Sequence, residues 1–181
     1  NGLKRTHGMR NFYCVNSEKY RERAAALAEQ MALRYKDYPG LVAWHVANEY
    51  STFCHCENCE KKFRVWLKKK YGTTEELNKR WNTSFWGRTV YDFDTIMLPT
   101  ERNDDDKFFP AKQLDYQRFV TDTTEECFLN EANVLRRITP DIPVFSNISG
   151  FIKKLNQFQL TRNMDIVGWD NYPSPKDDAA F

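Results

Sequence analysis

The chain has 181 residues, which corresponds to about one domain at roughly 150 residues per domain. Hydrophobic residues make up 41%, charged residues 29% and aromatic residues 15%, a composition that supplies a folded core and argues against disorder. The 27 basic and 25 acidic side chains leave a formal net charge of +2, so neither general nucleic-acid binding nor an acidic tail is expected. Since no apolar run approaches the roughly 20 residues of a membrane span, we also expect no membrane partner.

The first half of the chain is expected to contain two helices with a strand between them. Apolar residues at helical spacing predict helices over residues 17–36 and 57–71. Residues 41–47 form a short apolar run without alternation, which is typical of a strand buried on both faces in a parallel sheet. This strand ends at Asn48 and Glu49.

The second half continues the alternation of helices and strands. Thr73 and Glu76 form a capping box, which predicts a short helix through Trp81. Residues 82–110 have no regular pattern, and a long helix is predicted over 111–138. The last expected elements are a strand over 143–146, a weaker helix over 151–163 and a strand over 166–170.

Polar residues follow each of the three expected strands. Asn48 and Glu49 end the first, Ser146 and Asn147 end the second, and Asp170 with Tyr172 ends the third. Strands that alternate with helices predict an α/β fold with a parallel sheet. Because function gathers at the carboxyl ends of parallel strands, we expect a site at this edge of the sheet.

Five cysteines are present, and this odd number excludes a framework in which every cysteine is paired within the chain. Cys54, Cys56 and Cys59 fall within six residues, on a turn that leads into a predicted helix. The crowding favours a metal site over one disulfide with leftover thiols, because closely spaced cysteines strain a disulfide.

Zinc takes four ligands, so three local thiolates need a fourth from elsewhere. Cys14 is the better candidate because it precedes a helix at a loop-like position, whereas Cys127 lies on the apolar side of a long helix and is expected in the core. His55 alternates with the thiols and is an alternative ligand, but an exposed histidine beside the cluster is the favoured interpretation. Four thiolates leave no open position, so such a zinc would be structural.

Glu49 follows the first strand directly, with Trp44 and Tyr50 near it in sequence. Burial against aromatic rings raises the pKa of a carboxyl group, which keeps it protonated for donation near neutral pH. Asn48 offers both a donor and an acceptor to a hydroxyl-rich ligand. On its own, a glutamate after a strand is more often a capping or salt-bridged residue, so the general-acid hypothesis depends on its surroundings.

Several short motifs surround the cysteine cluster. They are His45-Val46-Ala47-Asn48-Glu49-Tyr50, Cys54-x-Cys56-x-x-Cys59, Phe63-Arg64-x-Trp66-Leu67, Tyr71-Gly72-Thr73, Leu77-Asn78-x-x-Trp81, Phe85-Trp86, Tyr13-Cys14-x-Asn16-Ser17 and Gly168-Trp169-Asp170-Asn171-Tyr172-Pro173. Over nearly the whole chain, this pattern resembles glycoside hydrolase family 42, the β-galactosidases.

The resemblance implies a partial (β/α)8 barrel in which residues 1–181 supply about strands four to six, with residues 50–110 as a zinc-binding excursion. Glu49, at the end of strand four, would be the acid/base of a retaining glycosidase, and Asn48 would hold the sugar 2-hydroxyl. Trp86, Asn147 and Tyr172 are the further positions expected to bind substrate, and Cys14, Cys54, Cys56 and Cys59 match the family's ligands of structural zinc.

The same resemblance implies a nucleophilic glutamate at the end of strand seven, which we expect beyond Phe181, and three strands before Asn1. Residues 1–181 alone are therefore expected to be inactive. The expected substrate is a β-galactoside oligosaccharide, and the complete enzyme is expected to be a homotrimer whose subunits lend Trp86 to one another. Metal-bound thiols favour a reducing cytoplasm.

Two alternatives stay open from the sequence. Another barrel glycosidase, of β-glucosidase or arabinosidase type, would also carry Asn-Glu at a strand end. The second is a non-catalytic, zinc-stabilised binding module, supported by the basic and aromatic stretch Lys61–Lys70. The charges of that stretch also fit a solvated helix face and its aromatic residues a buried one, so we expect no nucleic-acid partner.

Overall fold

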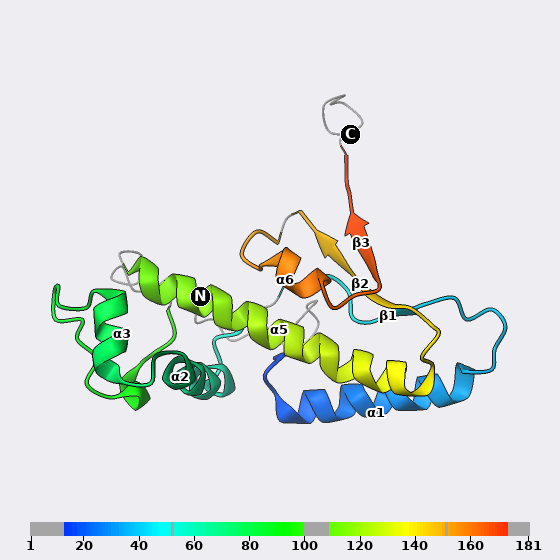
Figure 1. Cartoon of the computed structure of the whole chain (residues 1–181), viewed down its shortest axis with the longest axis horizontal. Coiled ribbons are helices and arrows are strands. Elements are labelled where there is room, and N and C mark those ends of the chain that lie inside the picture. The colour runs from blue at the N-terminus through cyan, green and yellow to red at the C-terminus, as the bar shows by residue number, and fades with distance from the viewer. Residues whose placement is uncertain (1–12, 52, 100–108, 151, 174–181) are drawn as a thin grey trace. The chain divides into compact units, whose positions relative to one another are not determined.

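The structure is a computed structural model that describes residues 13–51, 53–99, 109–150 and 152–173 (Figure 1). Its elements are α1 (Glu18–Tyr35), β1 (Trp44–His45), α2 (Glu57–Tyr71), α3 (Thr74–Trp81), the 3-10 turn η1 (Phe93–Thr95), α5 (Pro110–Ile138), β2 (Val144–Ser149), α6 (Gln157–Thr161) and β3 (Ile166–Asp170).

The described residues form two compact units. We call residues 13–21, 53–99 and 109–124 the excursion unit, and residues 22–51, 125–150 and 152–173 the sheet unit. Helices α1 and α5 each contribute residues to both units. The part of the expected excursion at residues 52 and 100–108 lies outside the described residues.

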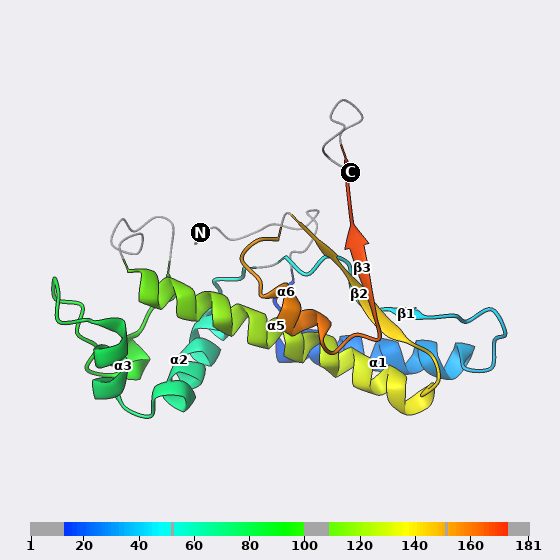
Figure 2. The same ribbon diagram turned by 45° about the horizontal axis from the view of Figure 1, so that its top comes forward.

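The sheet unit contains three parallel strands in the order β1-β2-β3. Trp44 pairs with Val144, and the register between β2 and β3 is continuous from Phe145 opposite Ile166 to Ser149 opposite Asp170. Figure 2 shows β2 and β3 running side by side in one direction. This arrangement confirms the predicted α/β class with a parallel sheet.

The core of the sheet unit lies on one face of β2. Val144 and Ser146 are completely buried there, and Trp44 of β1 donates from Nε1 to Thr139 Oγ1 at 2.9 Å. The same core contains apolar residues of the two long helices: Ala28 and Ala32 of α1, and Phe128, Ala132 and Leu135 of α5.

The prediction of a strand over residues 41–47 with both faces buried is wrong in length and in burial. Only Trp44 and His45 form the strand, His45 is exposed, and Val42 is 79% exposed. In the described residues β1 has one neighbouring strand, so only the part beside Val144 and Phe145 is held in a ladder.

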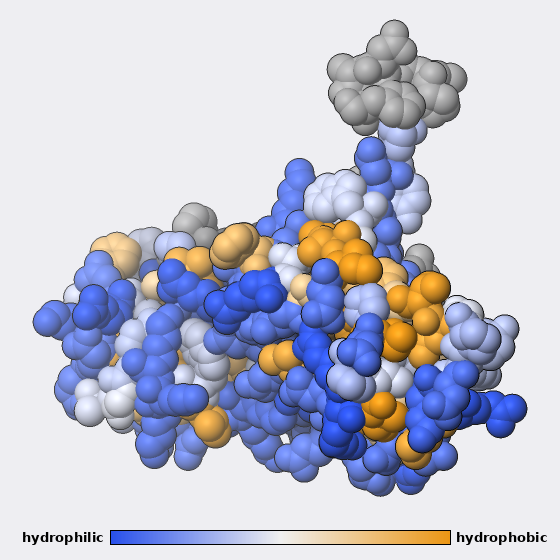
Figure 3. Space-filling view, turned by 45° about the vertical axis from the view of Figure 1, so that its right-hand side comes forward, coloured by the Kyte–Doolittle hydropathy of each residue, from blue (hydrophilic) through white to orange (hydrophobic). Residues whose placement is uncertain are grey.

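Strand β3 exposes apolar side chains on both of its faces. Ile166, Val167 and Trp169 are 47%, 48% and 56% exposed. Figure 3 shows apolar surface on the part of the molecule that carries the sheet. Parallel strands are normally covered on both faces. The exposed apolar surface of β3 is therefore typical of a surface that packs against further elements.

Local signals set the ends of the helices in the excursion unit. Helix α2 ends at Tyr71 and is capped by Gly72, which has a positive φ of 75°. Thr73 Oγ1 then accepts from Glu76 N at 3.3 Å and starts α3, which confirms the predicted N-cap, whereas Thr73 N donates to Tyr71 O at 2.9 Å. Asn82, with a φ of 54°, ends α3.

The remaining long helices match their predicted ranges, but α6 covers only Gln157–Thr161 of the predicted 151–163. Residue 151 lies outside the described residues.

Helix α2 buries the aromatic side of the basic stretch. Phe63 and Leu67 are completely buried, and the Phe63 ring lies 5.3 Å from that of Phe119 on α5. The lysines at 61, 68, 69 and 70 are exposed. The basic stretch is therefore an amphipathic helix with a solvated face, as the simpler interpretation predicted.

A buried carboxylate joins the helices of the excursion unit. The side chain of Asp115 on α5 is 2% exposed. It accepts hydrogen bonds from Tyr71 Oη at 2.5 Å, Trp81 Nε1 at 2.9 Å, Arg118 Nη1 at 3.1 Å and the ammonium group of Lys70. Burial alone would raise the pKa of Asp115, but these donors hold it below its usual range.

We predict that Asp115→Asn lowers the free energy of unfolding by about 2 kcal/mol at pH 7, because buried donors lose a charged acceptor. Folding lowers the pKa of Asp115. The contribution of Asp115 to the free energy of unfolding is therefore complete above its unfolded-state pKa of about 3.9, and it is lost as the pH falls through its lower folded-state pKa. Thermal unfolding of the unaltered protein and of Asp115→Asn between pH 2 and 7 measures the difference in stability. This difference should become smaller toward pH 2.

Glu76→Gln is the matched control. It breaks the exposed ion pair between Glu76 and Arg80, whose side chains are 38% and 68% exposed. Exposed pairs of this kind contribute little to stability, because water screens the two charges. Equal losses in the two variants would contradict the role given to Asp115.

Candidate functional site

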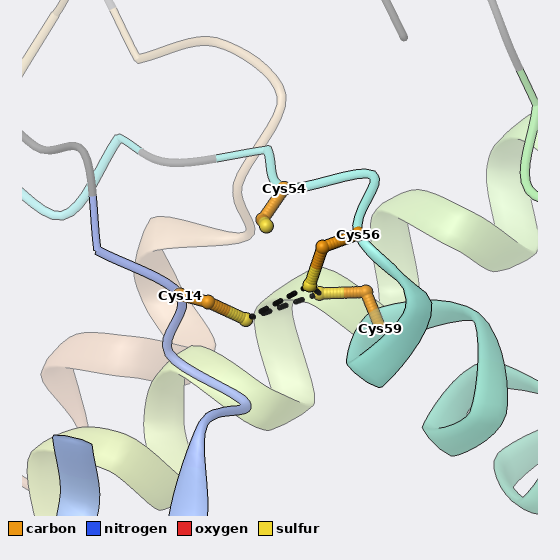
Figure 4. A group of neighbouring side chains, drawn as sticks. All are labelled: Cys14, Cys54, Cys56 and Cys59. Carbon is orange, nitrogen blue, oxygen red and sulfur yellow. Dashed lines mark hydrogen bonds between the residues drawn. The ribbon is translucent and has the colours of Figure 1, made fainter. Parts of the chain in front are cut away.

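The predicted zinc ligands come together in the excursion unit. Cys14 precedes α1, Cys54 and Cys56 lie in the loop before α2, and Cys59 lies in the first turn of α2 (Figure 4). Their four Sγ atoms all lie within 4.8 Å of one another. Cys14 is thus the fourth member of the group, as the sequence predicted.

The sulfur positions fit a tetrahedral metal ion. Cys14 Sγ lies 3.4 Å from Cys59 Sγ and 3.6 Å from Cys56 Sγ, and the Cys56–Cys59 distance is 3.8 Å. A tetrahedral zinc site with bonds of about 2.3 Å places its sulfur atoms about 3.8 Å apart. Disulfide sulfurs lie about 2.05 Å apart, so these three pairs are not disulfides.

Side chains around the cluster hold its two chain segments. Arg21 donates from Nε to Val15 O at 2.7 Å and from Nη2 to Thr123 O at 3.0 Å, which fixes the loop after Cys14 to α5. Asn16, only 2% exposed, donates from Nδ2 to Cys59 Sγ at 3.4 Å. An N–H donor of this kind stabilises a thiolate.

Tyr116 holds the second segment. Its hydroxyl donates to Cys54 O at 2.6 Å. Burial is the largest cause that raises the pKa of Tyr116, and the nearby cysteines raise it further. Hydrogen bonds from the Cys14 and Cys59 thiols lower the pKa of Cys54.

The two remaining ligand candidates are not part of the group. The ring of His55 lies 5.0 Å from that of Tyr116, and the metal-ligand group found among the described residues contains four cysteines and no histidine. Cys127 is completely buried on α5, as expected for a core thiol.

The predicted acid lies on a strained turn of the sheet unit. Ala47 and Glu49, on either side of Asn48, have positive φ angles of 53° and 47°. Non-glycine residues rarely adopt this left-handed conformation, which costs about 1–2 kcal/mol per residue. Glu49 is half-buried and Asn48 is exposed, so both side chains can be reached from solvent.

The middle of β2 holds this turn. Ser146 Oγ donates to Ala47 O at 3.3 Å, and Glu49 N donates to Asn147 Oδ1 at 2.9 Å. Asn147 Nδ2 donates to Asn48 Oδ1 at 3.1 Å. Adjacent residues of one strand therefore fix both ends and the middle of the turn that carries the carboxyl group.

Two further residues belong to this group and were not among the predicted site residues. Asp170 Oδ2 accepts from Asn147 Nδ2 at 2.5 Å, and His45 Nε2 lies 3.0 Å from Asn147 Oδ1. The His45 ring also stacks on Phe145 at 4.9 Å. Side chains alternate between the two faces of a strand, so Phe145 and Asn147 lie on the same face of β2. Because His45 stacks on Phe145, this alternation is the signal that could have predicted its contact with Asn147.

The other two predicted substrate residues are exposed aromatic side chains. Tyr172, two residues beyond β3 in the sheet unit, is 68% exposed. Trp86, in the excursion unit, is 71% exposed, has a φ of 55° and stacks on Phe85 at 4.6 Å. Trp86 also lines a pocket of about 360 Å³ together with Arg88 and Phe109.

Among the described residues, none of the helices has the length and apolarity that crossing a membrane requires.

Comparison with known proteins identifies the family. The model of the β-galactosidase family, glycoside hydrolase family 42, matches residues 1–180. The chain belongs to this family. The resemblance inferred from the motifs around Glu49 and the cysteines is therefore confirmed.

Relatives within the family are similar over nearly the whole chain. The β-galactosidase BgaP of Planococcus sp. (strain L4) is 46% identical over 177 residues, which cover 96% of this chain and 26% of BgaP. The β-galactosidase LacZ of Heyndrickxia coagulans is 42% identical over 181 residues. The chain thus spans about a quarter of the length of these relatives.

Solved structures agree with the described fold. A β-galactosidase from Bacillus circulans sp. alkalophilus superimposes with a TM-score of 0.89 at 48% identity, over 97% of this chain and 26% of its own. The β-galactosidase from Rahnella sp. R3 gives a TM-score of 0.91 at 31% identity, over 96% of this chain and 26% of its own. An exo-carrageenase of the same family from Bacteroides ovatus, at 24% identity and a TM-score of 0.66, shares the fold.

Proposed function

We propose that the protein is a retaining glycoside hydrolase that releases terminal β-D-galactose, with Glu49 as general acid/base. The observation that carries this proposal is the Glu49 carboxyl group on a strained turn at the carboxyl end of a parallel strand, held by the next strand. Functional groups of barrel enzymes occupy this position. The relatives named β-galactosidases support the choice of galactose.

In the proposed reaction, Glu49 donates its proton to the glycosidic oxygen while the bond from that oxygen to C1 breaks. A carboxylate nucleophile attacks C1 and forms a glycosyl-enzyme. Glu49, now ionised, then takes a proton from water as the water oxygen attacks C1 and releases the nucleophile. We infer that the nucleophile is the family's glutamate at the end of strand seven, and that residues 1–181 contribute about strands four to six of a (β/α)8 barrel.

The exposed side chains near the strand ends supply the proposed substrate contacts. Asn48 Nδ2 lies 3.4 Å from Glu49 Oε2, so a hydroxyl bound by Asn48 would lie next to the acid. We assign the sugar 2-hydroxyl to Asn48. Trp86 and Tyr172 offer the flat apolar faces on which sugar rings stack. We propose that a homotrimer brings Trp86 to the site of a neighbouring subunit.

The four cysteines are proposed to hold structural zinc. Their sulfur positions fit a tetrahedral ion, and four thiolates leave no position for water or substrate. Zinc would fasten the segment before α1 to the loop before α2 and stay outside the reaction. Thiolate ligands of this kind fit a reducing cytoplasm, where we propose that the protein acts.

Zinc removal gives the first test of this proposal. The product of the complete open reading frame is expected to contain one zinc per chain by elemental analysis. Cys56→Ser is expected to lose the metal and unfold at a lower temperature, because three thiolates bind zinc more weakly than four. Cys127→Ala, which changes a cysteine outside the group, should keep one zinc; zinc well below one per chain in the unaltered protein contradicts the site.

Glu49→Gln tests the acid role in the same complete protein. We expect kcat/KM for phenyl β-galactoside to fall on the order of 10²–10⁴-fold, because the departing phenolate needs a proton. For dinitrophenyl β-galactoside, whose leaving group departs unprotonated, kcat/KM should change little. Unchanged hydrolysis of the phenyl galactoside would exclude Glu49 as the acid.

Substrate preference separates galactosidase from the other barrel glycosidases. We expect the complete protein to hydrolyse nitrophenyl β-galactoside with a higher kcat/KM than the matching β-glucoside or α-arabinoside, and residues 1–181 expressed alone to hydrolyse none of them. Preference for the glucoside or arabinoside would favour the alternative glycosidase. Hydrolysis by residues 1–181 alone would contradict the assignment of the nucleophile.

A further inference from the structure

We infer that Asn147 is a positioning residue, which sets the direction of the Asn48 amide and holds the Glu49 turn, and does not itself bind the sugar. This inference rests on the proposed acid role of Glu49. It assigns an indirect role to a residue that the sequence counted among the substrate contacts.

The side chain of Asn147 has no hydrogen-bonding capacity left for a substrate. Its Oδ1 is shared by Glu49 N at 2.9 Å and His45 Nε2 at 3.0 Å. Its Nδ2 donates to Asn48 Oδ1 at 3.1 Å and to Asp170 Oδ2 at 2.5 Å. An asparagine side chain has two acceptor sites and two donors, and all four are used here. Asn147 is also only 8% exposed.

Two of these partners fix which way the Asn147 amide points. The backbone N–H of Glu49 can only donate, so it requires the oxygen of Asn147 on its side. The ionised carboxylate of Asp170 can only accept, so it requires the NH₂ group on the opposite side. A flipped amide would lose both bonds at once.

The fixed direction of Asn147 is passed on to its other two neighbours. Since Nδ2 of Asn147 is a donor, Asn48 must turn its oxygen toward it. The Nδ2 group of Asn48 then points the other way, where it lies 3.4 Å from Glu49 Oε2. Asn48 is therefore oriented to donate toward the acid and toward an oxygen of a bound sugar. His45 must carry its proton on Nε2.

Tight packing keeps Asn147 in place. Gly168 of β3 pairs with Asn147, and a Cβ atom at Gly168 would lie 3.2 Å from both Cα and Cβ of Asn147. That contact is closer than ordinary van der Waals separation, so a side chain at 168 would require Asn147 or its neighbours to shift by a few tenths of an ångström. Glycine at this point of β3 thus preserves the position from which Asn147 reaches the Glu49 turn.

Asn147→Asp in the complete protein tests the inference, because aspartate keeps the shape and the acceptors but loses both donors. We expect the kcat/KM ratio of dinitrophenyl to phenyl β-galactoside to rise on the order of 10–100-fold, as the acid and Asn48 lose their orientation. Glu49→Gln, measured alongside, should raise the same ratio further. A general loss of folded protein would lower both rates equally and leave the ratio unchanged.

Asn163→Asp is the matched control. Asn163 donates from Nδ2 to Glu125 Oε1 at 2.5 Å, so this substitution also replaces a donor to a carboxylate by a second carboxylate, away from the Glu49 turn. It should lower the unfolding temperature by a similar amount and leave the ratio of rates unchanged. Should Asn147→Asp fail to fold, Asp170→Asn replaces it: an asparagine at this position can donate as well as accept, so it no longer fixes which way the Asn147 amide points, and the ratio should rise several-fold.

Two results would overturn the inference while leaving the acid role intact. One is a ratio for Asn147→Asp no higher than for Asn163→Asp, when Glu49→Gln raises it. The other is an equal rise of KM for both substrates at unchanged kcat, which would mean that Asn147 binds the sugar directly. If Glu49→Gln itself leaves the ratio unchanged, the proposed acid role fails, and the inference fails with it.

Discussion

The position of β2 between two parallel neighbours is the constraint on which the strand-end geometry depends. Val46 N donates to Phe145 O at 2.8 Å, so the ladder extends just past the last residue of β1. At the start of β2, Val144 N donates to Asp165 Oδ2 at 2.8 Å, and Asp165 N donates to Val144 O at 3.0 Å. This exchange fixes the register in which Ser146 and Asn147 reach the Glu49 turn.

The helices could be predicted from the sequence because their signals are local. The signals are the N-cap at Thr73, the glycine at 72 and the apolar spacing of α2, and each lies in or beside the helix that it defines. The ends of the strands could not be read in the same way. An apolar run such as residues 41–47 indicates that this segment can form a strand. How many of its residues do so is set by pairing with β2, which lies nearly 100 residues later in the chain.

The same difference between local signals and contacts of distant segments applies to the candidate sites. Three cysteines within one turn predict a cluster by themselves, and only Cys14 had to be found at a distance. Asn48 and Glu49 stand out because they follow an apolar run. The contact between Asn147 and Asp170 has no local signal, because it depends on the continuous register of β2 and β3. Sequence reasoning singled out Asn48, Glu49 and Asn147, and it missed the contacts that join them.

The left-handed turn at Ala47 and Glu49 has a consequence for anyone who seeks a more heat-resistant variant. Glycine would relax the backbone at position 47, where alanine is held at a φ of 53°. It would also make the turn more flexible, and the rigidity of this turn holds the Glu49 carboxyl group in position. Under the proposed acid role of Glu49, a substitution that favours heat resistance would therefore work against turnover at this one residue, although its side chain is a single methyl group.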